Sequence, residues 1–491
     1  MPDNDIHILI KKIDGDIKAH AILVGPIDNE RVENTFAKTE AESSETDDSA
    51  TNTPTVQEKG ELGSPFPEDF RGVERSFTQA MLMYRKSVVE TINFAPVFAA
   101  GMLGVSVERV ANSHGIKRDD LSTDEIFVHS APDHAFGLIN RFIDQSNALI
   151  EGAQHLPKIA TIGLISSYDA ILSDLLQVIF KQKPEIVFTS DRVVKFSELL
   201  ELDTLEAVRD SIIGNEIEGV IRQSHHEQFE WMEKKFGMKL REGLDIWPDF
   251  IELCERRNLL THTDGVVSEQ YLKNCESHGK KAKSNVGDKL VADLAYLTFA
   301  INTVSEIGFK LIHTMWRKFL PDEREQADIV LNETGMDLIA AGEYDLAEVL
   351  LQFGVTQKRH SSDLLKRMMI VNLANAAKLG GNKDRCDRAL SSHDWSATSY
   401  QFQICVAAVK NDFKEVIRLL KLGGSVIEIT PSGFRDWPVF RDARKDKAVQ
   451  VVFAEVFGEP LEKDGARASS ATSKLSETIE CSENGKDTIV H

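Results

Sequence analysis

The sequence predicts an all-α protein with a small β-hairpin at its N-terminus. Long stretches repeat apolar residues at three- and four-residue spacing, which is typical of helices that bury one face. Proline is scarce, at 14 in 491 residues, so few helices are interrupted. The composition, 42% hydrophobic and 27% charged, is ordinary for a chain with a sizeable core. A chain of this length holds about three domains.

Residues 1–27 are predicted to form the hairpin. Apolar and polar residues alternate on both sides of an Asp14-Gly15 pair, with Ile6, Ile8 and Ile10 before it. Asp-Gly between two alternating stretches favours a tight β-turn. An isolated hairpin is marginally stable in water, so we expect it to dock on the chain or on a partner.

Two segments are predicted to be disordered. Residues 28–65 form an acidic linker with few large apolar side chains, and residues 463–491 are rich in Ser, Thr and Glu. Such segments bury too little apolar surface to offset the loss of chain entropy on folding.

The middle of the chain is predicted to be helical throughout. Residues 66–129 form one helical unit, since Phe77, Met81, Tyr84, Val88 and Ile92 lie on a common face. Residues 130–320 form a bundle of long helices. The helices expected there are 135–153, 159–180, 197–202, 205–221, 228–236 and 288–319.

Residues 321–462 contain an internal repeat. The segment 338–350 is similar to 405–417 at an offset of 67 positions, and residues 374–390 form a degenerate middle copy. In each copy small alanines allow two helices to approach, and an Asp (Asp345, Asp387 or Asp412) is expected to cap the second helix. The region resembles a tetratricopeptide-like solenoid of helical hairpins, whose concave face commonly binds a protein, here a partner or an antitoxin.

Charge and cysteine usage limit the function classes. A formal charge of −21 argues against a general nucleic-acid coat protein, although an enzyme on an acidic body can carry a local basic patch. The five cysteines form no CxxC pair, so neither a disulfide framework nor a cysteine zinc site is predicted, and no cofactor is implied. The N-terminus lacks the layout of a signal peptide, and the apolar stretch 94–107 is too short to span a bilayer. We expect a cytoplasmic protein without membrane contact.

The segment from Arg257 to His262 carries the chemistry that we consider. Cleavage of RNA by its own 2′-hydroxyl needs a base for the hydroxyl proton and a cation at the phosphoryl oxygens. His suits the first role because its pKa lies near neutrality, and Arg suits the second because it stays charged and donates paired hydrogen bonds. Five residues apart on a helix, the two side chains point different ways. His262 must therefore sit at a fraying end, or two protomers must share a cleft. The pair Asp264-Gly265 is a predicted helix stop.

The spacing alone is not specific. Arg109–His114 and Arg388–His393 repeat it without any supporting context. The alternative for His262 is a helix-terminal histidine whose ring bonds to a backbone carbonyl.

The surroundings add a resemblance. The run from Glu255 to Val267, with Tyr271 after it, resembles the signature of the HEPN superfamily, in its branch of stand-alone ribonuclease toxins and defence proteins. Segments 167–176, 200–208 and 219–236 are also similar to that domain. The resemblance implies a bundle that dimerises and a metal-independent ribonuclease. Arg257 would hold the phosphate, His262 would act on the 2′-hydroxyl, Asn258 would orient the site, and Arg256 would make a second phosphate contact.

One departure from the family concerns Asp264. Members paired with nucleotidyltransferase antitoxins carry Tyr two residues after the His, so Asp264 argues against regulation by modification of that Tyr. Lys273, Lys280, Lys281 and Lys283 form a basic cluster predicted to bind RNA; the alternative is a solvated loop.

Two other functions stay open. Many HEPN proteins have lost catalysis, so the chain is alternatively a dimerisation scaffold with protein-binding repeats. A nucleotide-sensing bundle without cleavage is the third hypothesis, and a nucleotide that protects the chain from thermal unfolding would favour it.

Overall fold

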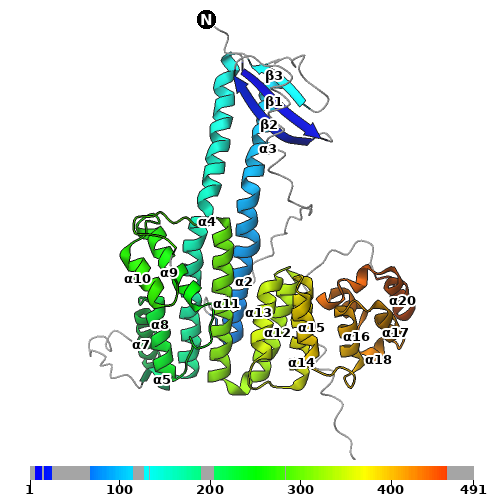
Figure 1. The fold of residues 1–491 in the computed structure, drawn as a ribbon. Helices are drawn as coiled ribbons and strands as arrows, with labels where there is room; N and C mark the ends of the chain where they lie inside the picture. The colour runs from blue at the N-terminus through cyan, green and yellow to red at the C-terminus, as the bar shows by residue number, and fades with distance from the viewer. Residues whose placement is uncertain are drawn as a thin grey trace, which may run out of the picture. The chain divides into compact units, whose positions relative to one another are not determined.

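The computed structural model describes residues 6–13, 16–24, 67–113, 126–131, 133–188, 204–281 and 283–461. These residues are mostly helical (Figure 1), which confirms the predicted all-α class. The chain divides into two compact units, residues 1–308 and 309–491. The predicted linker 28–65, the tail 463–491 and the helix 197–202 lie outside the described residues.

Three short strands pair in the first unit. Strand β1 (Ile6–Ile13) is central and pairs antiparallel with β2 (Asp16–Val24) and with β3 (Ile126–Ala131), giving the order β2-β1-β3. Ile6 pairs with both Val24 and Ala131. The alternating pattern therefore predicted the β1–β2 pairing and the need for docking, but not β3, which we had assigned to a helical unit.

Two long helices adjoin this sheet (Figure 1). Helix α2 (Phe70–Leu82) continues through the π-helical turn η1 (Met83–Val88) into α3 (Val89–Ser113). Helix α4 (Asp133–Gln182) packs along α3. The helical face predicted from Phe77 onward is confirmed, since Phe77, Met81, Tyr84 and Ile92 are buried. The ring of Phe77 lies where a Cβ on Gly308 would otherwise stand.

The remaining helices of the first unit lie beside the C-terminal half of α4 (Figure 1). They are α5 (Glu185–Phe188), α7 (Leu205–Ile221), α8 (His225–Phe236), α9 (Trp247–His262), α10 (Glu269–Ser277) and the start of α11 (Leu294–Phe319). The range of α7 was predicted to the residue. Three other ranges were wrong. The ranges 135–153 and 159–180 belong to one helix, α4, and the range 288–319 is helical only from Leu294, because the residues before it pair with the turn after α9.

Two helices of this unit have the length and apolar composition to cross a bilayer. They span Phe70–Ser106 and Asn140–Gln182, with a mean hydropathy of 1.5 and 1.4 in their most apolar windows. Core helices of soluble proteins have the same composition, and 22% and 44% of these windows are buried within the protein. The absence of membrane contact stays a prediction.

The second unit begins with three helical hairpins after the single turn η2 (Pro321–Glu323). Their helices are α12 (Arg324–Ala340) with α13 (Tyr344–Val355), α14 (Asp363–Leu379) with α15 (Lys383–Ser391), and α16 (Tyr400–Val409) with α17 (Phe413–Leu420). The internal sequence repeat thus corresponds to hairpins with three-residue turns. Each turn contains one left-handed residue, namely Gly342, Gly381 or Asn411.

The predicted capping is correct in only one of the three hairpins. Asp412 caps α17, since its carboxylate accepts a hydrogen bond of 3.1 Å from the N–H of Glu415. Asp345 instead lies in the first turn of α13, whose N-cap residue is Glu343, and Asp387 lies inside α15, which Asn382 caps. Asp345 and Asp387 are not caps because the second helix of each hairpin begins directly after the three-residue turn, before the Asp is reached.

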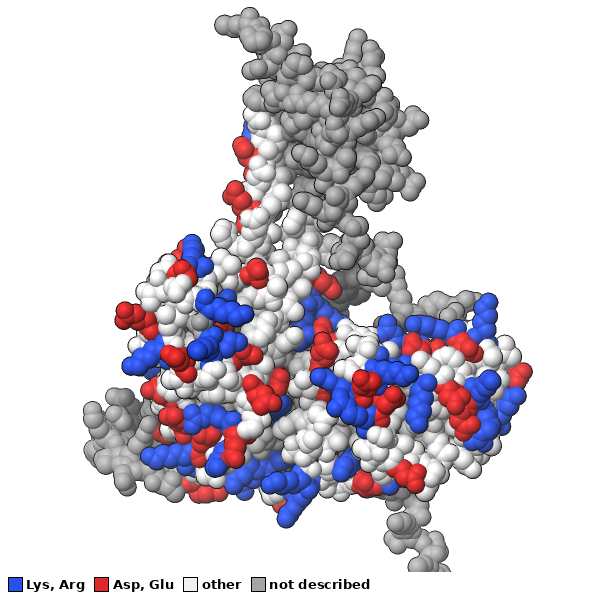
Figure 2. All heavy atoms as spheres, in the orientation of Figure 1, with Lys and Arg blue, Asp and Glu red and all other residues white. Residues whose placement is uncertain are grey.

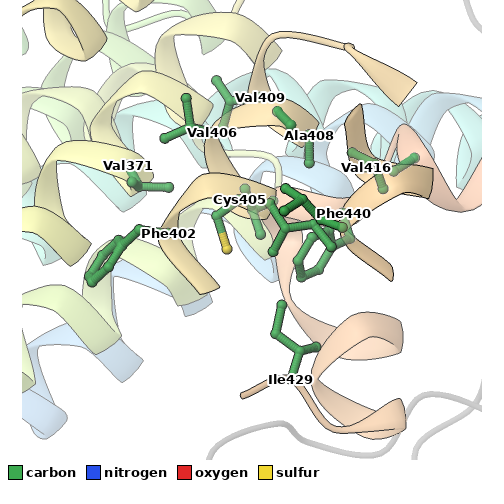
Figure 3. Packing of buried hydrophobic residues seen from close by; sticks show 14 of the residues in the cluster. Val371, Phe402, Cys405, Val406, Ala408, Val409, Val416, Ile429 and Phe440 are labelled. Carbon is green, nitrogen blue, oxygen red and sulfur yellow. The ribbon is translucent and has the colours of Figure 1, made fainter. Parts of the chain in front are cut away.

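The C-terminal part of this unit has one continuous apolar core. It closes with α18 (Gly424–Ile427), α19 (Pro431–Asp436), η3 (Pro438–Phe440), η4 (Ala443–Lys445) and α20 (Lys447–Phe457). Figure 3 shows Val371 of α14, Phe402 and Cys405 of α16 and Val416 of α17 in this core, with Phe440. The four described cysteines are free and buried.

Candidate functional site

Helix α9 carries the predicted motif and ends where the sequence indicated. Thr263 is its C-cap, and both Thr263 and Gly265 donate their N–H groups to the carbonyl of Leu259 at 2.9 Å. Asp264 and Gly265 follow in left-handed conformations, with φ of 51° and 85°. Two consecutive left-handed residues end a helix, so the predicted stop is confirmed.

The turn after α9 is fixed against the chain that precedes α11. Gly265 accepts a hydrogen bond of 2.8 Å from the N–H of Leu290, and Val267 donates one of 2.8 Å to Asp288. A Cβ on Gly265 would lie 2.2 Å from the carbonyl oxygen of Leu290. Only glycine therefore fits here, and the end of α9 that carries His262 is held in place.

Asp264 joins three elements at this turn. Its carboxylate accepts hydrogen bonds from Lys158 of α4 and from Lys289, the latter at 2.6 Å. Hydrogen bonds and charge from these two lysines lower the pKa of Asp264 to about 2. Asp264 thus connects α4 to the end of α9.

The inner face of α9 is anchored by a buried carboxylate. Glu252 accepts hydrogen bonds from Tyr271 at 2.7 Å, from Tyr296 at 2.9 Å and from Nε of Arg256 at 2.8 Å. The Arg256 guanidinium also lies 3.9 Å from the ring centre of Tyr296. Burial raises the pKa of Tyr296 far above its usual value, so the hydroxyl stays a donor. Arg256 is therefore engaged in packing α9 against α10 and α11.

Arg257 faces α4 and α8 instead. Its Nη2 lies 3.5 Å from Oδ2 of Asp169, and the other oxygen of Asp169 lies 3.0 Å from Nε2 of His225. The side chains of Arg257 and Asp169 are each 23% exposed, so the pair lies at the edge of the core. Nε of Arg257 is buried and has no hydrogen-bond partner in the structure. One carboxylate thus orients both a guanidinium and an imidazole.

The surroundings of this cluster are apolar. The ring of Tyr168 packs edge-on against Phe250, with centroids 5.1 Å apart, and lies 6.0 Å from the His225 ring. Burial holds the pKa of Tyr168 well above its usual range, and its hydroxyl is buried without a hydrogen-bond partner in the structure. Burial likewise raises the pKa of the Cys254 thiol. Both groups are neutral near pH 7, and neither is a nucleophile or base there.

The outer face of α9 presents the other predicted residues. Asn258 and His262 are exposed, and neither has a hydrogen-bond or ion-pair partner among the described residues. Among the described residues, no backbone carbonyl bonds to the His262 ring, as the alternative explanation of this residue would require. The two side chains are available to a ligand or to a second copy of the protein.

The predicted basic cluster is only partly available. Lys280 forms an ion pair with Asp249 of α9, while Lys273, Lys281 and Lys283 are exposed. Figure 2 shows basic and acidic side chains interspersed on the face in view. Among the described residues, no group of three or more His, Cys, Asp or Glu side chains is arranged to hold a metal ion.

The sequence did not predict the partners of Arg257. Asp169 lies 88 positions before Arg257, and His225 lies 32 positions before it. Asp169 lies inside the apolar run 159–180, and this position could have indicated a buried ion pair. A carboxylate on the core face of a helix is costly unless a partner pairs with it. No protein-family model, curated protein or solved structure matches this chain.

Proposed function

We propose that this protein is a metal-independent endoribonuclease in which Arg257 binds the scissile phosphate and His262 accepts the 2′-hydroxyl proton. The observation that supports the proposal is that the polar side chains of α9 fall into two groups. Glu252 and Arg256 bond inward, whereas Asn258 and His262 are exposed without partners among the described residues. Asn258 and His262 are therefore available to a substrate.

The chemistry balances without a further reactant. The 2′-oxygen attacks the adjacent phosphorus as His262 takes its proton, and the bond to the 5′-oxygen breaks. The products are a 2′,3′-cyclic phosphate and a 5′-hydroxyl, with the leaving oxygen protonated from solvent. Arg257 stabilises the charge that builds on the phosphoryl oxygens.

Arg257 and His262 serve the same phosphate only if two copies contribute. Five residues along an α-helix rotate a side chain by about 140° relative to the first. Arg257 contacts Asp169 on α4, whereas His262 is exposed at the end of α9. The dimer implied by the family resemblance supplies the second copy, so each site would combine Arg257 of one protomer with His262 of the other.

Asp169 would be a positioning residue in this site. It engages one edge of the Arg257 guanidinium, and a guanidinium has five N–H donors, so donors remain for phosphate. The three exposed lysines near α10 would add phosphate contacts. We extend the proposal to a toxin or antiphage-defence role, with the C-terminal hairpins binding a protein partner or antitoxin.

The decisive experiment is incubation of the full chain with RNA in EDTA, followed by analysis of the fragment ends. Wild type should leave 2′,3′-cyclic phosphates, and Arg257→Ala and His262→Ala should each lower the rate at least about a hundredfold. His393→Ala is the matched control, because Arg388 and His393 have the same spacing elsewhere and should not matter. Cleavage that survives His262→Ala would sink the assignment.

A mixing experiment tests the shared site. After subunit exchange between Arg257→Ala and His262→Ala, about half of the dimers are mixed, and each has one intact site. About a quarter of wild-type activity should return. No recovery, despite exchange shown by mass, would place both residues in one protomer or in none.

The second candidate function is a non-catalytic dimerisation scaffold. The ion pair between Arg257 and Asp169 favours it, because a purely structural arginine also pairs with a carboxylate. Absence of cleavage by wild type, together with a loss of stability in Arg257→Ala, would support the scaffold instead.

A further inference from the structure

Helix α3 is apolar on two opposite faces. One face is buried against the rest of the first unit, through Ile92, Ala99 and Leu103. The opposite face, called here the α3 outer face, is exposed. It consists of Phe94, Val97, Phe98, Met102 and Val105, which are 64%, 67%, 62%, 49% and 49% exposed. A helix that is apolar all round is normally covered on every side.

The α3 outer face is large enough to matter. Phe94, Phe98, Met102 and Val105 follow one another at steps of four, four and three residues, and Val97 lies three residues after Phe94, so the five form a single stripe along the helix. Two half-exposed phenylalanines and three aliphatic residues present on the order of 500 Å² of apolar surface. Patches of this size on a monomer usually mark an interaction site.

The charged side chains of α4 argue against a lipid bilayer around the α3 outer face. Where α4 runs beside α3, its outward side chains include Arg141, Asp144 and Glu151, all exposed. A helical pair that crossed a membrane would place these charges at hydrocarbon depth, which is strongly unfavourable.

The α3–α4 pair therefore has an apolar stripe on α3, whereas the exposed side chains of α4 beside it are mostly polar or charged, with Leu149 as an exposed apolar side chain among them. Such a one-sided pair is completed by another that presents the same pattern, with apolar helices inside and polar helices outside. Gly101 lies in the middle of the stripe, and a Cβ there would meet nothing within 4 Å. A small residue at this position lets a second helix approach closely.

We propose that the α3 outer face binds the same face of a second copy of this chain. Two α3 helices pack about a two-fold axis, and the two α4 helices lie on their far sides, giving a layer of four helices in the order α4-α3-α3-α4. The symmetric contact buries on the order of 1,000 Å² in total, the lower limit for a specific interface. This inference rests on the proposed function, whose shared site also needs a dimer, and it names the surface that forms that dimer. Its readout is the oligomeric state, so a dimeric wild type that does not cleave RNA would contradict the proposed function alone.

The first test is the mass of the full chain in solution. Wild type should sediment as a dimer at micromolar concentration. Phe94→Glu with Phe98→Glu should give a monomer, with dissociation shifted at least about a hundredfold, since like charges then meet in an apolar contact. Asn147→Glu with Gln154→Glu, on the exposed polar side of α4, is the matched control and should stay dimeric.

A second test does not depend on charged substitutions. A residue at the middle of a two-fold face lies beside its own symmetry mate whichever way the helices run. Phe98→Cys should therefore cross-link between copies with a short bifunctional maleimide, and Asn147→Cys should not. The four described native cysteines are buried, and wild type supplies the background.

Three outcomes overturn the proposal. They are a wild-type monomer at high micromolar concentration, a dimer that survives the paired glutamate substitutions, and equal cross-linking at positions 98 and 147. A wild-type monomer that co-floats with phosphatidylcholine–phosphatidylglycerol vesicles, with flotation lost in the glutamate variant, would assign the face to a lipid surface instead.

Discussion

Three carboxylates hold α9 and the turn after it, and each does so in a different environment. Glu252 is buried and accepts three hydrogen bonds, Asp169 is partly buried between a guanidinium and an imidazole, and Asp264 is exposed between two lysines. Because burial sets how strongly a charge responds to the loss of its partner, their substitutions should differ in size and in pH dependence.

Glu252→Ala should destabilise the first unit severely. The change leaves the Arg256 guanidinium, whose side chain is only 18% exposed, without its carboxylate, and two tyrosine hydroxyls lose their acceptor. We expect the free energy of unfolding to fall by about 3–5 kcal/mol, measured by denaturant titration. Glu276→Ala, at an exposed position of α10, is the control and should change it by less than about 0.5 kcal/mol. Equal effects would mean that the buried cluster contributes little.

Asp264→Asn should reveal a charge effect confined to neutral and mildly acidic pH. The pKa of Asp264 is lowered to about 2, so its carboxylate stabilises the fold above the unfolded value of about 3.9. That contribution is lost as the pH falls through about 2. Wild type should therefore melt above the variant at pH 6, and the gap should close between about pH 4 and pH 2. Asn tolerates the left-handed backbone, so a gap that persists at pH 2 would point to a cause other than charge.

At the scale of the element, the end of α9 depends on one glycine. Gly265 and Gly287 have similar left-handed angles, with φ of 85° and 90°, yet only Gly265 faces a carbonyl at contact distance. The two positions therefore separate backbone strain from steric overlap.

Gly287→Ala should lower the free energy of unfolding by about 1–2 kcal/mol through backbone strain alone. Gly265→Ala should lower it by about 1–3 kcal/mol more, because the added Cβ must displace the carbonyl of Leu290. Thermal unfolding of both variants measures the difference. In the proposed enzyme, Gly265→Ala should also slow cleavage, since His262 lies three residues before the turn; equal stability of the two variants would contradict the steric argument.

Local sequence patterns predicted where helices occur better than they predicted whether two helical stretches form one continuous helix. The spacing of apolar residues gave α7 and the hairpins of the second unit, because each buries one face. The sequence analysis predicted two helices, 135–153 and 159–180, where α4 is one helix that contains Pro157. A proline removes one hydrogen bond, and its surroundings decide whether the helix ends there. Those surroundings are tertiary contacts, which local spacing does not contain.

The same distinction applies to the candidate site. The Asp264-Gly265 stop was predictable because turn chemistry is local. The contact between Arg257 and Asp169 joins residues on separate helices, and periodicity can assign each residue to a face but cannot choose the partner of that face. The engagement of Arg256 by Glu252 was equally hidden, although the two lie four residues apart, because it needs the tyrosines of α10 and α11.

At the scale of the whole molecule, the net negative charge of the protein opposes the binding of RNA, the proposed substrate. The chain has a formal charge of −21, and RNA is a polyanion. Binding must then rest on a few cations near the site, and each contact displaces a counterion from the RNA.

Two or three phosphate contacts to single-stranded RNA predict that KM rises about tenfold between 50 and 200 mM KCl. The value of kcat should not change, because salt acts on association and not on the bound complex. Steady-state kinetics with a short RNA measures both, and replacing Lys281 and Lys283 with Ala should reduce the salt dependence. A KM that is insensitive to salt would exclude these lysines as phosphate contacts.

Helix α4 reaches α9 at two places, through Lys158 at the Asp264 turn and through Asp169 at Arg257. These residues are eleven positions apart, close to three helical turns, so both side chains point the same way. One inserted or deleted residue between them would rotate one relative to the other by about 100°, and only one contact could survive. The eleven-residue interval thus fixes the spacing of the two contacts, and homologous chains that keep both contacts should differ there at exposed side chains but not in length.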